Sequence, residues 1–132
     1  EIMGEDATYA YQLIRNGYKI VYTPSAQVYH SHNYSLRQNF KRYFDTGVYR
    51  STSELAKSDI GKKDMGQGSR YLKYCIRELI NRKEYLLLIN LFANTSASFL
   101  GYSLGKKHTL IPISIKKKLS MHSYYWTNPR TK

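Results

Sequence analysis

The interpretation of the fold starts from residues 4–30, GEDATYAYQLIRNGYKIVYTPSAQVYH. After two acidic residues, apolar side chains recur at helical spacing, and Asn16-Gly17 supplies a left-handed stop. Two short runs follow, residues 18–23 and 26–30, in which apolar side chains alternate with period two. The stretch therefore predicts a helix followed by two short strands.

Glu5 and Asp6 lie at the N-terminus of the predicted helix. Exposed backbone N–H groups and the positive end of the helix dipole favour ionised carboxylates at this position. A fixed, ionised carboxylate is suited to act as a general base. The alternative interpretation is that Asp6 is only an N-cap, which is the commoner role of an Asp at a helix start.

His30 ends the second predicted strand and shares one face of it with Ala26 and Val28. A histidine among apolar residues is more often a hydrogen-bonded core residue than a ligand. Here it follows an acidic pair and is itself followed, two positions on, by His32, and this context makes a metal ligand a reasonable second interpretation. Which of the two histidines would bind the metal stays open.

These motifs resemble those of a known enzyme family. The stretches Gly4-Glu5-Asp6 and Gly17-Tyr18-Lys19-Ile20, with Pro24, Val28 and His30, resemble the closing segment of the catalytic domain of inverting family-two glycosyltransferases. Residues 100–107 and 118–126 are similar to the C-terminal tail of bacterial rhamnosyltransferase-like members. Family-two enzymes have the nucleotide-sugar-binding fold called GT-A. The resemblance therefore implies an α/β fold class, with this chain as the C-terminal portion of a GT-A nucleotide-sugar transferase fold, short strands followed by a mostly helical region.

The same resemblance implies a function and roles for three residues. The enzyme would transfer a sugar from a nucleotide-sugar donor to the hydroxyl of a saccharide or lipid-linked acceptor with inversion, in bacterial cell-surface polysaccharide synthesis. Asp6 would be the catalytic base and Glu5 would support it. His30 would help to hold a divalent metal, Mn or Mg, that neutralises the donor diphosphate.

The donor-binding half of that family is not found in these 132 residues, which contain no Asp-x-Asp motif. The sequence also begins at Glu1 rather than at a methionine. We therefore expect a C-terminal piece of a longer enzyme that is inactive by itself. The donor sugar, its nucleotide, the acceptor and the linkage would be set by residues upstream.

The charge of the chain is uneven. Residues 1–34 carry two Lys or Arg side chains against three Asp or Glu, whereas residues 35–132 carry 19 against six. We divide the chain into residues 1–50, the end of the catalytic domain with the acidic and His motifs, residues 51–69, a polar link with three glycines, and residues 70–132, a basic helical region. Such a basic region implies an anionic partner.

Three helices are expected after residue 34. The first covers residues 36–44 behind Ser35 as N-cap, and residues 45–47 could end or bend it. An amphipathic stripe then predicts a helix over residues 70–80, and the apolar run that begins at Tyr85 is too short to span a bilayer. The last two helices are expected to pack as a hairpin against each other and against the catalytic domain.

The C-terminal third interleaves cations with aromatic residues, as in residues 116–118 and 124–126. Two interpretations stay open, a membrane-surface attachment and a solvated basic tail. With Cys75 as the single cysteine, the sequence fits a cytoplasmic enzyme with peripheral contact at the inner membrane face.

The alternative function is a non-catalytic basic module that binds a membrane surface or nucleic acid. No nucleic-acid-binding signature is present, so we do not expect nucleic acid as a partner. A truncated domain would expose apolar surface, which predicts self-association into a homo-oligomer.

Overall fold

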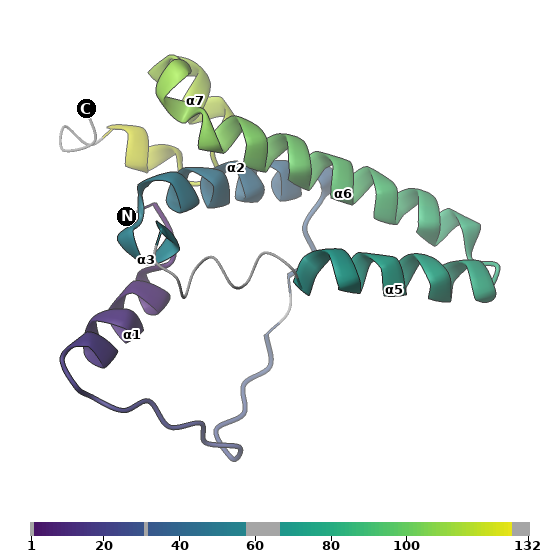
Figure 1. Cartoon of the computed structure of the whole chain (residues 1–132). Helices are drawn as coiled ribbons and strands as arrows, with labels where there is room; N and C mark the ends of the chain where they lie inside the picture. The colour runs from purple at the N-terminus through teal and green to yellow at the C-terminus, as the bar shows by residue number, and fades with distance from the viewer. Residues whose placement is uncertain (1, 31, 58–66, 128–132) are drawn as a thin grey trace.

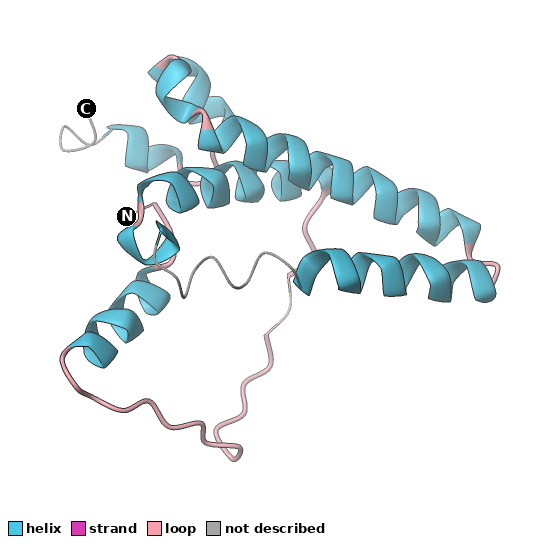
Figure 2. Ribbon diagram, viewed as in Figure 1, coloured by secondary structure: helices cyan, strands magenta, loops and turns pink. Residues whose placement is uncertain are grey.

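The computed structural model describes residues 2–30, 32–57 and 67–127. Its elements in chain order are α1 (Glu5–Arg15), α2 (Leu36–Thr52), α3 (Glu54–Lys57), α5 (Gln67–Asn81), α6 (Tyr85–Lys106), the short 3-10 helix η2 (His108–Leu110), α7 (Ile113–Leu119) and the 3-10 helix η3 (Ser123–Thr127). Every regular element within these ranges is helical (Figures 1 and 2).

The expected α/β fold class, with short strands completing a GT-A fold, is therefore wrong for the part of the chain that the structure describes. Residues 18–23 and 26–30 instead belong to an irregular connection between α1 and α2 (Figure 2). In this connection Tyr22 and Val28 are each 86% exposed. A strand needs a neighbouring backbone to pair its N–H and C=O groups, and the described ranges supply no such neighbour to these residues.

The helix predicted after the acidic pair is confirmed as α1, and glycines define both of its ends. Gly4 has φ +78° and Gly17 has φ +83°, a left-handed conformation that glycine adopts without steric cost. At the C-terminal end the Tyr18 N–H donates to the Leu13 carbonyl oxygen at 3.0 Å, the six-to-one bond of a Schellman motif. The predicted left-handed stop is thus confirmed.

The helix predicted from residue 36 is confirmed as α2, but it is longer than expected. Its start is a capping box, in which the Ser35 hydroxyl accepts from the Gln38 N–H at 3.3 Å and the Gln38 side chain accepts from the Ser35 N–H at 2.9 Å. The expectation that residues 45–47 end or bend the helix is wrong. Asp45 and Gly47 are buried inside it, because other segments of the chain pack over them.

α2 and α6 pack side by side and run in the same direction (Figure 1). Near the start of α2, the Asn39 amide donates to the Ser98 hydroxyl at 2.9 Å. Farther along, the backbone at Gly47 meets that of Tyr102 in α6, and the Ser51 hydroxyl near the end of α2 lies 3.4 Å from Nδ1 of His108, just after α6. Since the residue numbers rise together along both helices, the pair is parallel.

Three glycines let the two helix backbones approach. A Cβ atom added to Gly101 or Gly105 would collide with a carbonyl oxygen of α2, and one added to Gly47 would collide with the carbonyl oxygen of Tyr102. Small residues at a helix crossing bring the backbones into direct van der Waals contact. The parallel pair therefore depends on glycine at these positions.

The helices of the expected hairpin are found where predicted, and α6 packs on α2, within the part assigned to the catalytic domain, but α5 and α6 make little contact with each other. α5 and α6 are joined by a short turn and diverge from it, and α6 lies along α2 instead (Figure 1). Within the described ranges, no helix combines the length and the apolar character needed to cross a membrane. In α6 the polar residues Asn90, Asn94 and Ser98 interrupt the apolar run.

The most buried apolar side chains lie where the N-terminal residues, α2 and the C-terminal segment meet. Ile2, Phe44, Val48 and Trp126 are 0–7% exposed, and partly buried residues such as Leu119 pack against them. This small core ties both ends of the described chain to one helix, α2. Most of the predicted polar link, residues 58–66, lies outside the described residues, so the division of the chain into three parts stays a prediction.

Candidate functional site

Glu5 and Asp6 form the first turn of α1, and both are exposed. The Ala7 N–H donates to Oδ1 of Asp6 at 2.7 Å, which holds this carboxylate against the helix N-terminus. The N-cap position itself is occupied by Gly4, so Asp6 lies inside the first turn.

The three residues before the acidic pair pack against α2 and so fix the position of the pair relative to that helix. Ile2 is 4% exposed within the core. The Thr46 hydroxyl donates to the Met3 sulfur at 3.6 Å. At Gly4, an added Cβ atom would lie 2.8 Å from the ring of Tyr49, so the backbone is pressed against that ring. The acidic pair is therefore carried on a buried, well-packed support.

Asp45 anchors the C-terminal segment to the same helix. Its side chain is 1% exposed, and Oδ2 accepts from the N–H groups of Met121 at 2.8 Å and His122 at 3.1 Å. Burial raises the pKa of Asp45 above its ordinary value of 3.8, opposed by hydrogen bonds from Ser120 and the two amides. Asp45 thus joins elements that are far apart in sequence, and the sequence patterns alone did not single it out.

His30 and His32 lie together on the connection that leads into α2. Their rings meet edge to face at 4.3 Å, and the His32 ring stacks on Tyr34 at 4.9 Å. The guanidinium carbon of Arg42 in turn lies 5.1 Å from the centre of the Tyr34 ring. His30 is exposed, so the interpretation that it is a buried core histidine is wrong.

The described part of the chain does not assemble a complete metal site. It contains no grouping of three or more His, Cys, Asp or Glu side chains able to hold a metal ion. His30 and His32 are therefore not joined there by Glu5, Asp6 or another carboxylate. Two imidazoles alone do not fit Mg²⁺ or Mn²⁺, which prefer mostly oxygen ligands.

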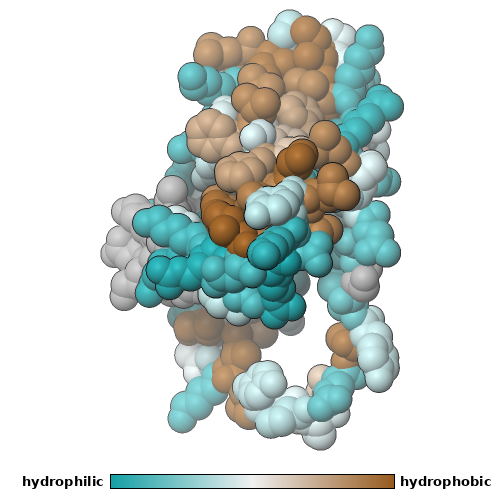
Figure 3. Space-filling model, turned by 90° about the vertical axis from the view of Figure 1, so that its right-hand side faces the viewer, coloured by the Kyte–Doolittle hydropathy of each residue, from teal (hydrophilic) through white to brown (hydrophobic). Residues whose placement is uncertain are grey.

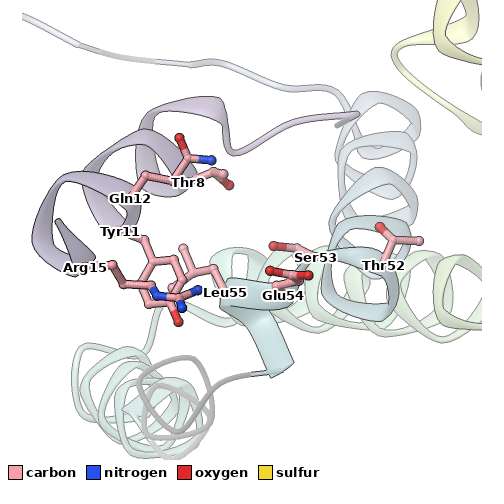
Figure 4. A pocket seen from close by; sticks show the side chains of 8 residues that line it. All are labelled: Thr8, Tyr11, Gln12, Arg15, Thr52, Ser53, Glu54 and Leu55. Carbon is pink, nitrogen blue, oxygen red and sulfur yellow. The ribbon is translucent and has the colours of Figure 1, made fainter.

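A pocket of about 260 Å³ lies between α1 and the junction of α2 with α3 (Figure 4). It is lined by Thr8, Tyr11, Gln12, Arg15, Thr52, Ser53, Glu54 and Leu55. At 3.6 residues per turn, Asp6 lies on the side of α1 opposite to Thr8 and Arg15. The pocket is therefore separate from Asp6, whereas Glu5, three residues before Thr8 and seven before Gln12, lies on the pocket side of α1.

His108 lies at the far end of the contact between α2 and α6. Its Nδ1 is 3.1 Å from the carbonyl oxygen of Gly105, and its ring centre is 5.9 Å from that of Trp126. Nζ of Lys116 is 4.9 Å from the centre of the Trp126 ring. Burial lowers the pKa of His108, opposed by the bond to Gly105 and assisted by the charge of Lys116. This cluster fastens the C-terminal segment at a second point.

Two curated proteins match nearly all of this chain. The O-antigen chain rhamnosyltransferase WbaN of Salmonella anatum is 41% identical over 127 residues, which are 96% of this chain and 40% of that protein. The O-antigen chain rhamnosyltransferase RfbN of Salmonella typhimurium is 40% identical over the same shares. This chain is similar to O-antigen chain rhamnosyltransferases.

The similarity covers only part of those relatives, because the chain spans about two fifths of their length. No family model matches the chain, and no solved structure matches it. The expected rhamnosyltransferase-like relationship is thus confirmed, while its assignment to family two stays a prediction. The roles expected for Glu5, Asp6 and His30 also stay predictions.

Proposed function

We propose that this chain is part of a glycosyltransferase that moves a rhamnosyl group from a nucleotide-activated donor to an acceptor saccharide in cell-surface polysaccharide synthesis. The observation that carries this proposal is the 40–41% identity, over 96% of the chain, to two O-antigen chain rhamnosyltransferases. The arrangement of the acidic pair supports it, since an exposed pair of carboxylates on an anchored helix start can reach an acceptor hydroxyl.

Asp6 is the proposed general base. Its exposed carboxylate, held through the Ala7 N–H, takes the proton of the acceptor hydroxyl while that oxygen attacks the anomeric carbon of the donor. The new glycosidic C–O bond forms as the bond to the nucleotide breaks, and the nucleotide leaves with the electron pair. Attack from the face opposite the leaving group inverts the anomeric configuration. Glu5, the adjacent residue, orients the acceptor.

We also propose a divalent cation, Mn²⁺ or Mg²⁺, as cofactor of the longer enzyme. His30, or His32 in its place, would be a ligand from this segment. The other ligands would come from the donor and from residues beyond those the structure describes. Because the described ligand set is incomplete, no step above depends on the cation.

The test is a transfer assay with the natural protein that contains this chain. The purified protein is given a nucleotide-activated rhamnose and a lipid-linked saccharide acceptor, and nucleotide release is followed beside NMR analysis of the new linkage. We expect acceptor-dependent release and a rhamnosyl linkage of inverted configuration. Transfer of a different sugar in preference to rhamnose, or release that does not depend on acceptor, would contradict the proposal.

A further inference from the structure

α6 has two opposite faces in different surroundings. One face contacts α2 through Asn94, Ser98, Gly101 and Gly105. Half a turn around the helix, large apolar side chains recur at helical spacing. These are Tyr85, Ile89, Phe92, Phe99 and Leu100, with exposed fractions of 59%, 65%, 51%, 69% and 57%. We call these five residues the outer face of α6.

The outer face is long enough to need an explanation, although the exposed Ser96 lies between Phe92 and Phe99 on it. Single exposed apolar residues are normal on protein surfaces, but a contiguous stripe of large ones marks an interaction site. Figure 3 looks onto the end of the molecule where α5 turns into α6, and hydrophobic side chains gather above a hydrophilic edge there. The rest of the described chain leaves this stripe uncovered.

Basic residues bracket the outer face along the chain. Arg82 and Lys83 come directly before α6, and Lys106 and Lys107 lie at its end. Arg82 is paired with Glu78 at 2.7 Å. Tyr85, at the start of the outer face, is 59% exposed. Lysines and tyrosines around an apolar stripe are the residues that favour the headgroup region of a membrane.

The charge of the chain decides between possible occupants of this face. The net charge is +12, and residues 35–132 carry 19 cations against six acids. Two such chains repel each other, which disfavours pairing through the same face. Nucleic acid is bound by rows of cations, whereas the five residues of the outer face are large apolar side chains. An anionic surface that also accepts apolar side chains satisfies both observations.

We propose that the outer face of α6 docks on an anionic lipid bilayer, with the helix lying in the plane of the interface. The apolar side chains enter the boundary between headgroups and acyl chains, while Lys83, Lys106 and Lys107 stay with the headgroups. α2, on the opposite side of α6, faces away from the lipid. This inference gives the proposed transferase a membrane partner, but its test does not use sugar transfer.

The test is flotation of the natural protein with vesicles of phosphatidylcholine that contain phosphatidylglycerol, without donor or acceptor. The double variant Phe92→Ser, Phe99→Ser removes two side chains of the outer face. Val28→Ser is the matched control, because Val28 is 86% exposed but lies on the connection between α1 and α2. We expect the partition coefficient of the double variant to fall at least about tenfold, as expected from the apolar area that two phenylalanines bury. The control is expected to float like the wild type.

A second measurement does not depend on how well the double variant folds. Phe99→Trp places a fluorophore on the outer face, and vesicles with brominated acyl chains should quench its emission. Failure of the wild type to float, unchanged flotation of the folded double variant, or an unquenched Phe99→Trp probe would overturn the proposal. If acrylamide failed to quench the Phe99→Trp emission in protein without vesicles, the outer face would already be covered and the proposal would be overturned. Light scattering would then show whether a second copy of the protein or another part of the same chain covers it.

Discussion

Asp45 shows how much a single buried residue does in this chain. Its Oδ2 accepts two backbone N–H bonds from the C-terminal segment, while its Oδ1 has no hydrogen-bond partner among the described residues. A buried N–H group that loses its acceptor costs about 1–3 kcal/mol. The side chain is therefore a positioning residue for the segment that follows α7.

We predict that Asp45→Ala destabilises the docked C-terminal segment by about 2–4 kcal/mol, because the N–H groups of Met121 and His122 lose their acceptor. Asp45→Asn keeps an oxygen in the same place and should cost much less. Hydrogen exchange at the amides of Met121 and His122 measures both effects. Slow, wild-type exchange at these amides in the Ala variant would show that Asp45 does not hold them.

The shifted pKa values of Asp45 and His108 predict opposite dependences of stability on pH. Since burial raises the pKa of Asp45 above 3.8, the native state binds this proton more tightly, and its contribution to stability falls as pH rises from 3.8 through the raised value. Since burial lowers the pKa of His108 below 6.5, its contribution falls as pH drops from 6.5 through the lowered value. We expect Asp45→Asn to abolish only the first dependence in denaturation curves measured across pH. If the stability of Asp45→Asn still fell as pH rose from 3.8, the assignment of this dependence to Asp45 would be contradicted.

Sequence patterns predicted the place of Glu5 and Asp6 but not that of Asp45. The apolar period begins directly after the acidic pair, so local sequence is enough to put the pair at a helix start. The role of Asp45 depends on Met121, which is 76 residues away. Locally, Asp45-Thr46-Gly47 has the composition of a helix end, and only the packing of the distant segment shows why the helix continues.

At the scale of elements, the parallel contact between α2 and α6 predicts a strong dependence on glycine. Gly105→Ala should destabilise the protein by about 3 kcal/mol or more, because its Cβ would collide with the carbonyl oxygen of Phe44 and the helix backbones would have to separate. Gly68→Ala is the control, since an added Cβ there meets nothing within 4 Å. It should be neutral or stabilising by up to about 1 kcal/mol.

Denaturant unfolding of both glycine variants tests this packing. Equal stability of Gly105→Ala and the wild type would mean that the two helices are not in direct backbone contact. Gly68 is itself in α5, so the comparison separates the helical preference of alanine from the steric effect at the crossing.

The sequence predicted α1 and α5 correctly, whereas the two predicted strands were wrong. A helix satisfies its hydrogen bonds within its own segment, so the period of residues 7–14 and of residues 72–80 is enough to predict α1 and α5. A strand needs a partner, and alternation over residues 18–23 does not provide one. The sequence did not specify α2 as the element on which α6 packs, because the glycines at this contact carry no apolar side chain and a hydrophobic pattern does not show them.

At the scale of the whole molecule, α2 links the two ends of the described chain. Residues 2–4 pack on one part of it, and the C-terminal segment packs on it through Asp45 and Trp126. We predict that Trp126→Ala, which empties a core position that is 7% exposed, destabilises the protein by about 3–5 kcal/mol. Tyr124→Ala, at a neighbouring position that is 69% exposed, should have little effect.

Thermal unfolding followed by near-ultraviolet circular dichroism compares these two aromatic variants. If Trp126→Ala and Tyr124→Ala were equally stable, the C-terminal segment would not be part of the core. Such a result would also contradict the conclusion that the acidic pair and the C-terminal segment are both held on α2.

The relationship to rhamnosyltransferases was predictable from short motifs, whereas the architecture was not. The motif Gly4-Glu5-Asp6 carried part of the resemblance, and at Gly4 the positive φ and the ring of Tyr49 restrict the residue type. Such motifs do not specify which segments pack together in a chain that spans about two fifths of its relatives. The described residues accordingly form a helical assembly around α2.

The proposed role of Asp6 as the base of a glycosyl transfer is tested by the rate of transfer by the natural protein carrying Asp6→Asn. Glu5→Gln is the comparison, and circular dichroism checks the fold of both variants. We predict that Asp6→Asn lowers the rate by about a hundredfold or more with the fold intact, as expected when a general base is lost. A near-normal rate would contradict the claim and leave Asp6 as a stabilising charge in the first turn of α1.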